Sequence, residues 1–183
     1  MTSLLRFDEV ALRRGGRLLF EGLSFELRPG ERLQVAGPNG SGKSSLIRLA
    51  AGLLRAEQGR IERSRLALAD ESAALDRELP LQRALRFWSP SPEKAIDALG
   101  LGHLQTVPVR LLSSGQLKRA TLARVAASGA PLWLLDEPLN ALDTQGAEQL
   151  ALMIEHHLES GGSVLAASHQ QLGGQWRRLE LAT

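Results

Sequence analysis

The chain has 183 residues, of which 43% are hydrophobic, and it carries 22 Lys and Arg against 20 Asp and Glu. This balance is typical of a globular protein, and the scattered cations, 19 Arg and three Lys, include no basic tract that would indicate a nucleic-acid partner. Cysteine is absent, which excludes disulfides, thiolate zinc sites and a cysteine nucleophile. The length predicts one domain, 1–183.

Neither a secretion signal nor a membrane span is expected. Arg6, Asp8 and Glu9 interrupt the N-terminal residues, and no apolar run approaches the 18 residues that a membrane span needs. With cysteine absent as well, the sequence favours a cytoplasmic chain that does not itself cross a membrane.

The first half of the chain predicts strands before a helix. Alternating apolar and polar residues predict antiparallel strands over 3–27, and residues 32–36 predict a short strand that leads into a glycine-rich turn, 37–42. The next helix has an apolar face formed by Leu46, Leu49, Ala50 and Leu53. Two short strands are expected within 61–69. Short helices are expected over 71–106.

The second half predicts alternating helices and strands. A hydroxyl N-cap candidate within 113–115 opens a helix that is expected to run to about 127, and a buried strand is expected over 131–135. A helix is expected after 144, with apolar residues on one stripe to 158, and a second buried strand over 164–167. This alternation predicts a parallel α/β sheet to which the early antiparallel strands are attached.

Residues 37–44 match the phosphate-loop pattern G-x-x-x-x-G-K-[ST] between a predicted strand and a predicted helix. Glycines let backbone N–H groups turn toward phosphate oxygens, Lys43 neutralises the outer phosphates, and the Ser44 hydroxyl can ligate Mg²⁺. The alternative is a plain glycine turn with a solvated lysine. The predicted nucleotide-binding residues are Gly37, Pro38, Asn39, Gly40, Ser41, Gly42, Lys43, Ser44 and Ser45.

Two adjacent carboxylates, Asp136 and Glu137, follow the buried strand over 132–135, at the end where open α/β sheets bind ligands. Mutual repulsion would make this pair costly unless a cation balances it. We therefore expect Asp136 to hold Mg²⁺ jointly with Ser44, and Glu137 to orient or deprotonate the attacking water in phosphoryl transfer.

Three further segments resemble motifs of the ABC-type ATPases. Residues 112–116 resemble the family's signature sequence, and Ser113 lies 70 positions after Lys43. Residues 139–143 resemble the D-loop, which ends on Asp143, and Ser168-His169 resembles the segment with the switch histidine. No such motif includes His103, His156 or His157, which we expect to be solvated.

The resemblance implies a P-loop NTPase fold of ABC type, with a mostly parallel core sheet, an N-terminal antiparallel β subdomain and a short helical subdomain at approximately 72–128. It implies ATP and Mg²⁺ as cofactors and a head-to-tail dimer of two copies. In that dimer, His169 contacts the γ-phosphate, and the signature residues of one copy contact the ATP of the other. These signature residues are Ser113, Ser114, Gly115 and Gln116.

Two positions depart from the family pattern. Glu71 falls where the family's Q-loop has a glutamine; a carboxylate there either ligates Mg²⁺ or weakens hydrolysis by repelling the other acids. Arg14 aligns with an adenine-stacking position that is usually aromatic, and a guanidinium can also stack on a base.

Within the family, the short chain and the segments 131–143 and 168–172 are most similar to the ATP-binding subunits of haem exporters in cytochrome c maturation. This implies a peripheral subunit on the cytoplasmic face of the inner membrane, bound to multi-span membrane subunits, with no nucleic-acid partner. An ABC ATPase of another small-substrate exporter and an ATP-binding regulatory module without turnover remain as alternatives.

Overall fold

The strands form one antiparallel and one parallel sheet in a computed structural model that describes residues 3–181. The antiparallel sheet has the order β2-β1-β4, and its strands are β1 (Leu5–Arg14), β2 (Arg17–Leu27) and β4 (Gln58–Arg63). The parallel sheet has the order β5-β6-β7-β3-β8. Its strands are β3 (Arg32–Ala36), β5 (Leu66–Ala69), β6 (Leu132–Asp136), β7 (Ser163–Ala167) and β8 (Arg177–Glu180).

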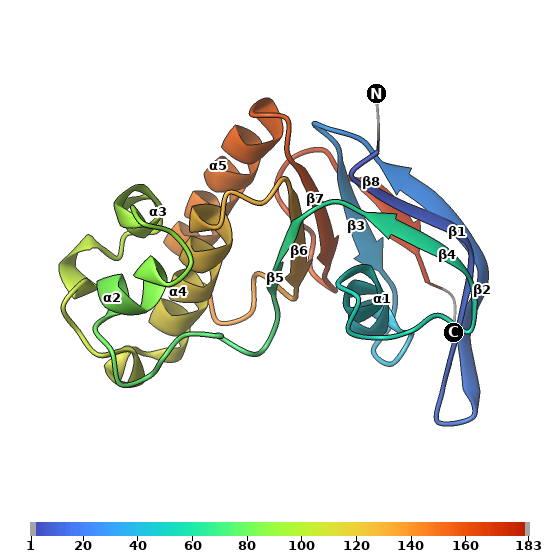
Figure 1. The fold of residues 1–183 in the computed structure, drawn as a ribbon, viewed down its shortest axis with the longest axis horizontal. Helices are drawn as coiled ribbons and strands as arrows, with labels where there is room; N and C mark the ends of the chain where they lie inside the picture. The colour runs from blue at the N-terminus through green and yellow to red at the C-terminus, as the bar shows by residue number, and fades with distance from the viewer. Residues whose placement is uncertain (1–2, 182–183) are drawn as a thin grey trace.

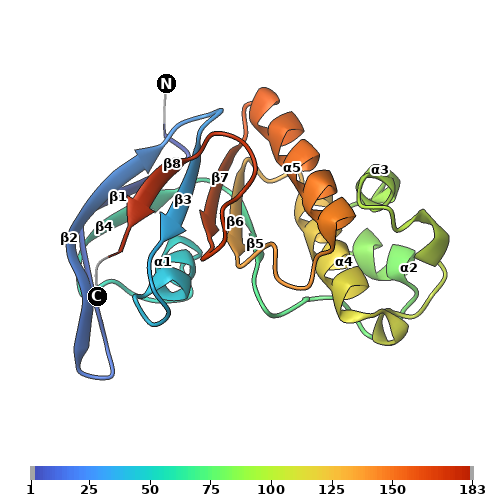
Figure 2. The same ribbon diagram turned by 180° about the vertical axis from the view of Figure 1, so that it is seen from behind.

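The helices lie on both faces of the parallel sheet (Figure 1). They are α1 (Lys43–Ala50), α2 (Leu81–Arg86), α3 (Glu93–Ala98), α4 (Ser114–Ala127) and α5 (Thr144–Glu159), with 3-10 turns at Gly102–Leu104 and Val109–Leu111. Helix α1 lies between the two sheets, whereas α4 and α5 cover the opposite face and α2 and α3 lie beyond them (Figures 1 and 2). This is the α/β architecture that the sequence predicts.

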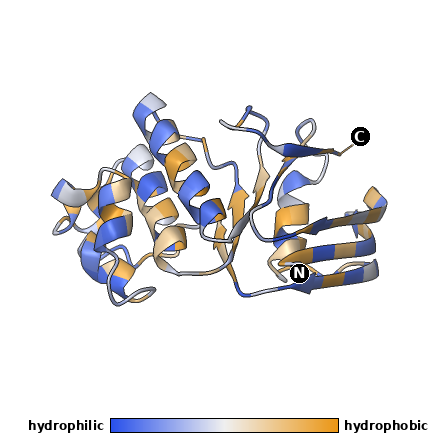
Figure 3. Ribbon diagram, turned by 90° about the horizontal axis from the view of Figure 1, so that it is seen from above, coloured by the Kyte–Doolittle hydropathy of each residue, from blue (hydrophilic) through white to orange (hydrophobic). Residues whose placement is uncertain are grey.

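The central strands are buried on both faces, which explains their unbroken apolar sequences. Every residue of β6 and β7 is buried. Because side chains alternate along a strand, Leu132 and Leu134 pack with α1 and the antiparallel sheet, while Trp133 and Leu135 pack with the helices on the other face. Figure 3 shows these strands as mainly hydrophobic ribbons between helices with mixed faces.

Two strands are present near 61–69 as predicted, but the first begins earlier, at Gln58, and joins the antiparallel sheet. Gly59 lies against the backbone carbonyls of Asp8 and Glu9, where β1 is bulged, and its φ is 82°. A side chain at this position would collide with that bulge, so the strand pairing requires a glycine here.

The prediction that Leu53 lies on the apolar face of the first helix is wrong. Helix α1 ends at Ala50, Gly52 has a φ of 77°, and the Leu53 N–H donates back to the Arg48 carbonyl at 2.8 Å. This left-handed glycine turn ends the helix and leaves Leu53 61% exposed.

Strand β8 has no counterpart in the prediction. It pairs in parallel with β3 at the edge of the sheet, and three of its four residues are exposed and charged. Its sequence therefore lacks the apolar pattern by which a strand is recognised.

The parallel sheet brings distant parts of the chain to one edge. Ala36, Asp136 and Ala167 end the neighbouring strands β3, β6 and β7, so the segments that follow them lie close together. No helix within residues 3–181 has the length and apolar character needed to cross a membrane.

Candidate active site

The predicted phosphate loop connects β3 to α1. The Lys43 ammonium group donates hydrogen bonds to the carbonyls of Gly37 at 2.8 Å and Pro38 at 3.0 Å, which hold its side chain across the loop. No side chain caps the first turn of α1, so its N–H groups are available to an anion. The Ser41 hydroxyl is buried within the loop and has no hydrogen-bond partner. These unpaired donors fit the phosphate oxygens of a nucleotide.

The conformation at Gly37 requires a glycine. Its φ is 141°, and an added Cβ would lie 2.7 Å from the Leu181 carbonyl oxygen and 2.8 Å from the Ser41 hydroxyl. The loop therefore packs against the C-terminal strand region as well as against its own serine.

The structure brings Ser44 and Asp136 together as predicted. The Ser44 hydroxyl donates to the Asp136 carboxylate at 3.0 Å across 92 positions of sequence. Burial raises the pKa of Asp136 and the nearby Glu137 adds to this, while the bond from Ser44 and the charge of Arg48 act in the opposite direction. A hydroxyl and a carboxylate are hard oxygen ligands, so this pair fits Mg²⁺ held between protein and substrate phosphates.

Glu137 and His169 form a second pair, with 2.9 Å between the His169 Nδ1 and a Glu137 carboxylate oxygen. Glu137 has a φ of 44°, unusual for a residue with a side chain, and its N–H donates to the Ala167 carbonyl at 2.8 Å. The chain thus turns sharply after β6, at the residue to which phosphoryl-transfer chemistry is assigned.

A cavity of about 370 Å³ opens over the phosphate loop. Arg14 and Leu19, from the antiparallel sheet, line it with loop residues and Glu137. The predicted base-stacking residue therefore lies at the same cavity as the phosphate-binding residues. The remaining lining residues are Asn39, Gly40, Gly42, Lys43, Ser44 and Ser45.

A second cavity, of about 290 Å³, adjoins the carboxylates. Glu71 lines it together with Ser44, Asp136 and Glu137. The residue that departs from the Q-loop pattern therefore lies at the edge of the parallel sheet where β3, β6 and β7 end, which we call the catalytic edge. Asp70 and Lys118 also line this cavity and were not identified from the sequence.

Lys118 lies on α4 with its ammonium group 3.3 Å from the Asp136 carbonyl oxygen, to which it donates. Burial lowers its pKa, while Asp136, Glu137, Asp70 and Glu71 act in the opposite direction. The sequence gives only a weak signal for Lys118. Its spacing of four residues places it on the same face of the helix as Ser114, but the sequence does not show that this face contacts the carboxylates.

The signature residues begin α4. The Ser113 hydroxyl accepts from the Gln116 N–H at 3.3 Å, and the Gln116 side chain accepts from the Ser113 N–H at 2.9 Å, a complete capping box. Ser114 lines the second cavity, whereas Ser113, Gly115 and Gln116 line neither of the two cavities described above.

The signature and the D-loop are in contact within the chain. A Cβ on Gly115 would lie 2.7 Å from the Ala141 carbonyl oxygen, so only glycine allows this approach. Asp143 caps α5 by accepting from the Gly146 N–H at 2.8 Å, and Arg119 of α4 lies 3.7 Å from its carboxylate.

The prediction that His157 is solvated is wrong, whereas His103 and His156 are exposed as expected. The His157 ring stacks on Trp133 with 3.7 Å between ring centroids, and it fills the space beside Gly162. Its Nε2 is buried without a hydrogen-bond partner, and burial lowers its pKa.

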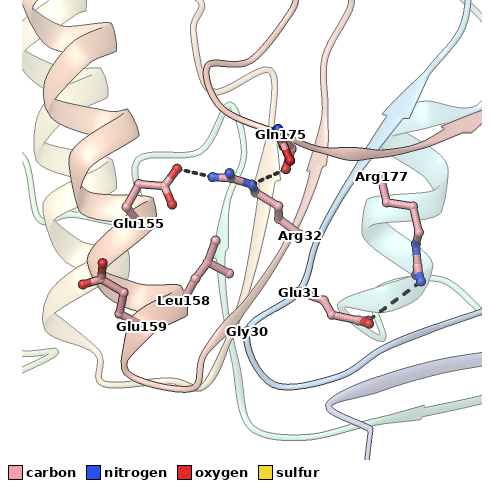
Figure 4. Close-up of a pocket in the computed structure, with 8 residues that line it drawn as sticks. All are labelled: Gly30, Glu31, Arg32, Glu155, Leu158, Glu159, Gln175 and Arg177. Atoms are coloured by element: carbon pink, nitrogen blue, oxygen red, sulfur yellow. Dashed lines mark hydrogen bonds and ion pairs between the residues drawn. The ribbon is translucent and has the colours of Figure 1, made fainter.

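The cavity drawn in Figure 4, of about 520 Å³, lies at the opposite edge of the sheet, where β3 begins. Arg32 pairs with Glu155 and Glu31 pairs with Arg177 on its walls. These two ion pairs engage four of the charged side chains that line it, Glu159 is the fifth, and no predicted site residue lines it.

Comparisons with known proteins identify the family of the chain. The sequence profile of the ABC transporter family matches residues 20–140. The cytochrome c biogenesis ATP-binding export protein CcmA of Sphingopyxis alaskensis is 54% identical over 177 residues, which cover 92% of this chain and 91% of that protein. The protein of the same name from Novosphingobium aromaticivorans is 55% identical over 170 residues, which cover 90% and 87%.

Solved structures share the fold. An ATP-binding subunit of an ABC transporter has a TM-score of 0.83 at 21% identity, covering 91% of this chain and 80% of that one. An ATP-binding cassette of an ABC transporter in its ADP conformation has a TM-score of 0.76 at 20% identity, covering 93% and 83%. The chain therefore belongs to the ABC transporter family, in the group of cytochrome c biogenesis ATP-binding export proteins.

Proposed function

We propose that this ABC ATPase powers the export or handover of haem in cytochrome c maturation. The observation that carries this proposal is the identity above 50%, over nearly the whole chain, to export proteins of cytochrome c biogenesis. A cytochrome c requires haem as its prosthetic group, so we assign haem as the substrate.

Each of the residues at the catalytic edge has its own role in ATP hydrolysis. The phosphate loop and Lys43 bind the phosphates, and Arg14 stacks on the adenine. Ser44 and Asp136 hold Mg²⁺, which when bound neutralises phosphate charge during the transfer. Glu137 accepts a proton from the attacking water, while His169 orients Glu137 through their 2.9 Å contact and reaches the γ-phosphate.

The active form is a head-to-tail dimer. Ser113, Gly115 and Gln116 line neither cavity at the catalytic edge of their own chain. The capping box at the start of α4 uses the N–H groups of Ser113 and Gln116, which leaves those of Ser114 and Gly115 at the positive end of the helix dipole. We assign this helix start, with Ser114, to the γ-phosphate of ATP bound by a second copy, with Asp143 and its D-loop beside it.

The whole chain, 1–183, is a single nucleotide-binding domain whose helical subdomain spans approximately 72–128. Its partners are multi-span membrane subunits, to which it binds at the cytoplasmic face of the inner membrane, and no nucleic acid is involved.

The test is to purify the Glu137→Gln variant with ATP and Mg²⁺ from gently solubilised membranes and to identify what co-purifies, with Lys43→Ala as the matched control that does not hold ATP. Multi-span subunits and haem-handling proteins with Glu137→Gln, and fewer with Lys43→Ala, support haem export. Membrane subunits of another exporter would contradict the haem assignment, and recovery of the variant alone would contradict transport and favour a regulatory module.

A further inference from the structure

The cavity beside Asp136 and Glu137 carries an unusual charge balance. Four carboxylates, those of Asp70, Glu71, Asp136 and Glu137, line it, and among the lining residues that the structure describes, Lys118 is the only cation. Glu71 enlarges this acidic cluster by one charge compared with a glutamine at the same position. Like charges that share one cavity repel one another unless a cation lies among them.

Lys118 is placed to offset that charge. The Lys118 side chain is half-buried, and its ammonium group donates to the Asp136 carbonyl at 3.3 Å. The negative charges of all four acids attract this ammonium group. No carboxylate within residues 3–181 lies within 4.0 Å of it, so the lysine acts on the cluster as a whole and is not committed to one partner.

Lys118 lies close to two functional parts of the chain, the signature and the carboxylates that follow β6. It lies one turn beyond Ser114 on α4, whose N-terminus is the signature, and it contacts the last residue of β6, which precedes Glu137. Lys118 is absent from the lining of the phosphate-loop cavity. It can therefore influence the position of the carboxylates without lining the phosphate-loop cavity.

We propose that Lys118 is a positioning residue for ATP hydrolysis, whose ammonium group balances the acidic cluster enlarged by Glu71 and fixes the end of β6 against the signature helix. This rests on the proposed function, in which Glu137 and Asp136 act in hydrolysis. It also explains how the chain accommodates a carboxylate at the Q-loop position.

The test is a double-mutant cycle between Glu71→Gln and Lys118→Gln, measured in two ways. In the membrane complex, Lys118→Gln lowers kcat for ATP about tenfold, equivalent to about 1.4 kcal/mol, with KM for ATP changed less than about twofold. Glu71→Gln with Lys118→Gln recovers kcat to within about threefold of the wild type, and Lys118→Arg retains it. Lys94→Gln, which removes an exposed lysine from α3, is the matched control and leaves kcat unchanged.

Thermal unfolding of the isolated chain without nucleotide or Mg²⁺ gives the second readout. Lys118→Gln lowers Tm by about 2–4 °C in the wild-type background and by clearly less when Glu71→Gln is present. Equal losses in both backgrounds, of Tm and of kcat, would indicate packing alone and overturn the proposal. The same coupling in Tm without any ATP hydrolysis by the wild type would uphold the charge balance and contradict the proposed function instead.

Discussion

A contact between two side chains, the Nδ1 of His169 and a carboxylate oxygen of Glu137 at 2.9 Å, joins the ends of neighbouring strands at the catalytic edge. Both residues follow strands that are wholly buried, so their backbones are fixed by the core. The Glu137 side chain lines both cavities, whereas the His169 side chain is half exposed beside it. The two buried strands therefore position the residues assigned to hydrolysis within hydrogen-bond distance of each other.

His157 gives the fold a pH dependence. Burial between Trp133 and Gly162 lowers its pKa below the ordinary 6.5, so the unfolded chain takes up a proton more readily than the folded chain. The effect is absent above pH 6.5, and as pH falls below it the free energy of unfolding decreases by up to about 1.4 kcal/mol per pH unit.

Urea unfolding between pH 7.5 and 5 measures this slope. We expect His157→Gln to flatten it, whereas His103→Gln, which changes an exposed histidine elsewhere in the chain, keeps the wild-type slope. If the His157→Gln protein and the wild type lost stability in parallel on acidification, His157 would not be the group that titrates.

At the element scale, α4 connects three parts of the molecule. Its first turn carries the signature, its middle carries Lys118, and its last turns carry Arg124, which is 5% exposed. The Arg124 guanidinium donates to the Leu68 carbonyl at 2.5 Å and the Ala73 carbonyl at 3.2 Å, and it stacks over Trp88 at 4.8 Å. The helix thus holds both sides of the segment that contains Glu71.

Arg124→Met tests this attachment. Losing the two charge-assisted hydrogen bonds should lower the free energy of unfolding by about 1.5–3 kcal/mol for each, and hydrogen exchange should rise in residues 68–73. Arg83→Met, at an exposed position of α2, should change stability by less than about 0.5 kcal/mol. Unchanged exchange in 68–73 would show that the segment is held by other contacts.

Some of these elements can be predicted from the sequence and others cannot. Apolar runs and a glycine-rich turn are local patterns, so they predict β6, β7, the phosphate loop and the position of Asp136 and Glu137 at a sheet edge. The strand β8 and the packing of His157 depend on neighbours distant in sequence, and their residues look like surface residues. Lys118 was missed for the same reason, because its role follows from which acids surround it.

At the scale of the whole molecule, the phosphate loop and the signature lie in different parts of the fold. The phosphate-loop cavity and the start of α4 are carried by different elements of one chain, and Gly115 and Gln116 of that helix start line neither cavity at the catalytic edge. The proposed dimer would bring the second copy's signature over the first copy's ATP.

Sedimentation velocity tests this arrangement. The Glu137→Gln chain should shift from monomer to dimer on addition of ATP and Mg²⁺, because it binds ATP but does not consume it. Lys43→Ala should stay monomeric at the same concentrations, since it lacks the phosphate-binding ammonium group. A Glu137→Gln chain that remains monomeric with ATP fully bound would contradict the head-to-tail dimer.

The most direct test of the central assignment is the steady-state ATPase rate of the membrane complex containing wild-type chain or Glu137→Gln. A general base contributes about 10²–10⁴-fold, so kcat should fall at least about 100-fold in the variant while ATP still binds. A variant that binds ATP and turns over within a few-fold of the wild-type rate would remove Glu137 from the chemistry and contradict the account of this site.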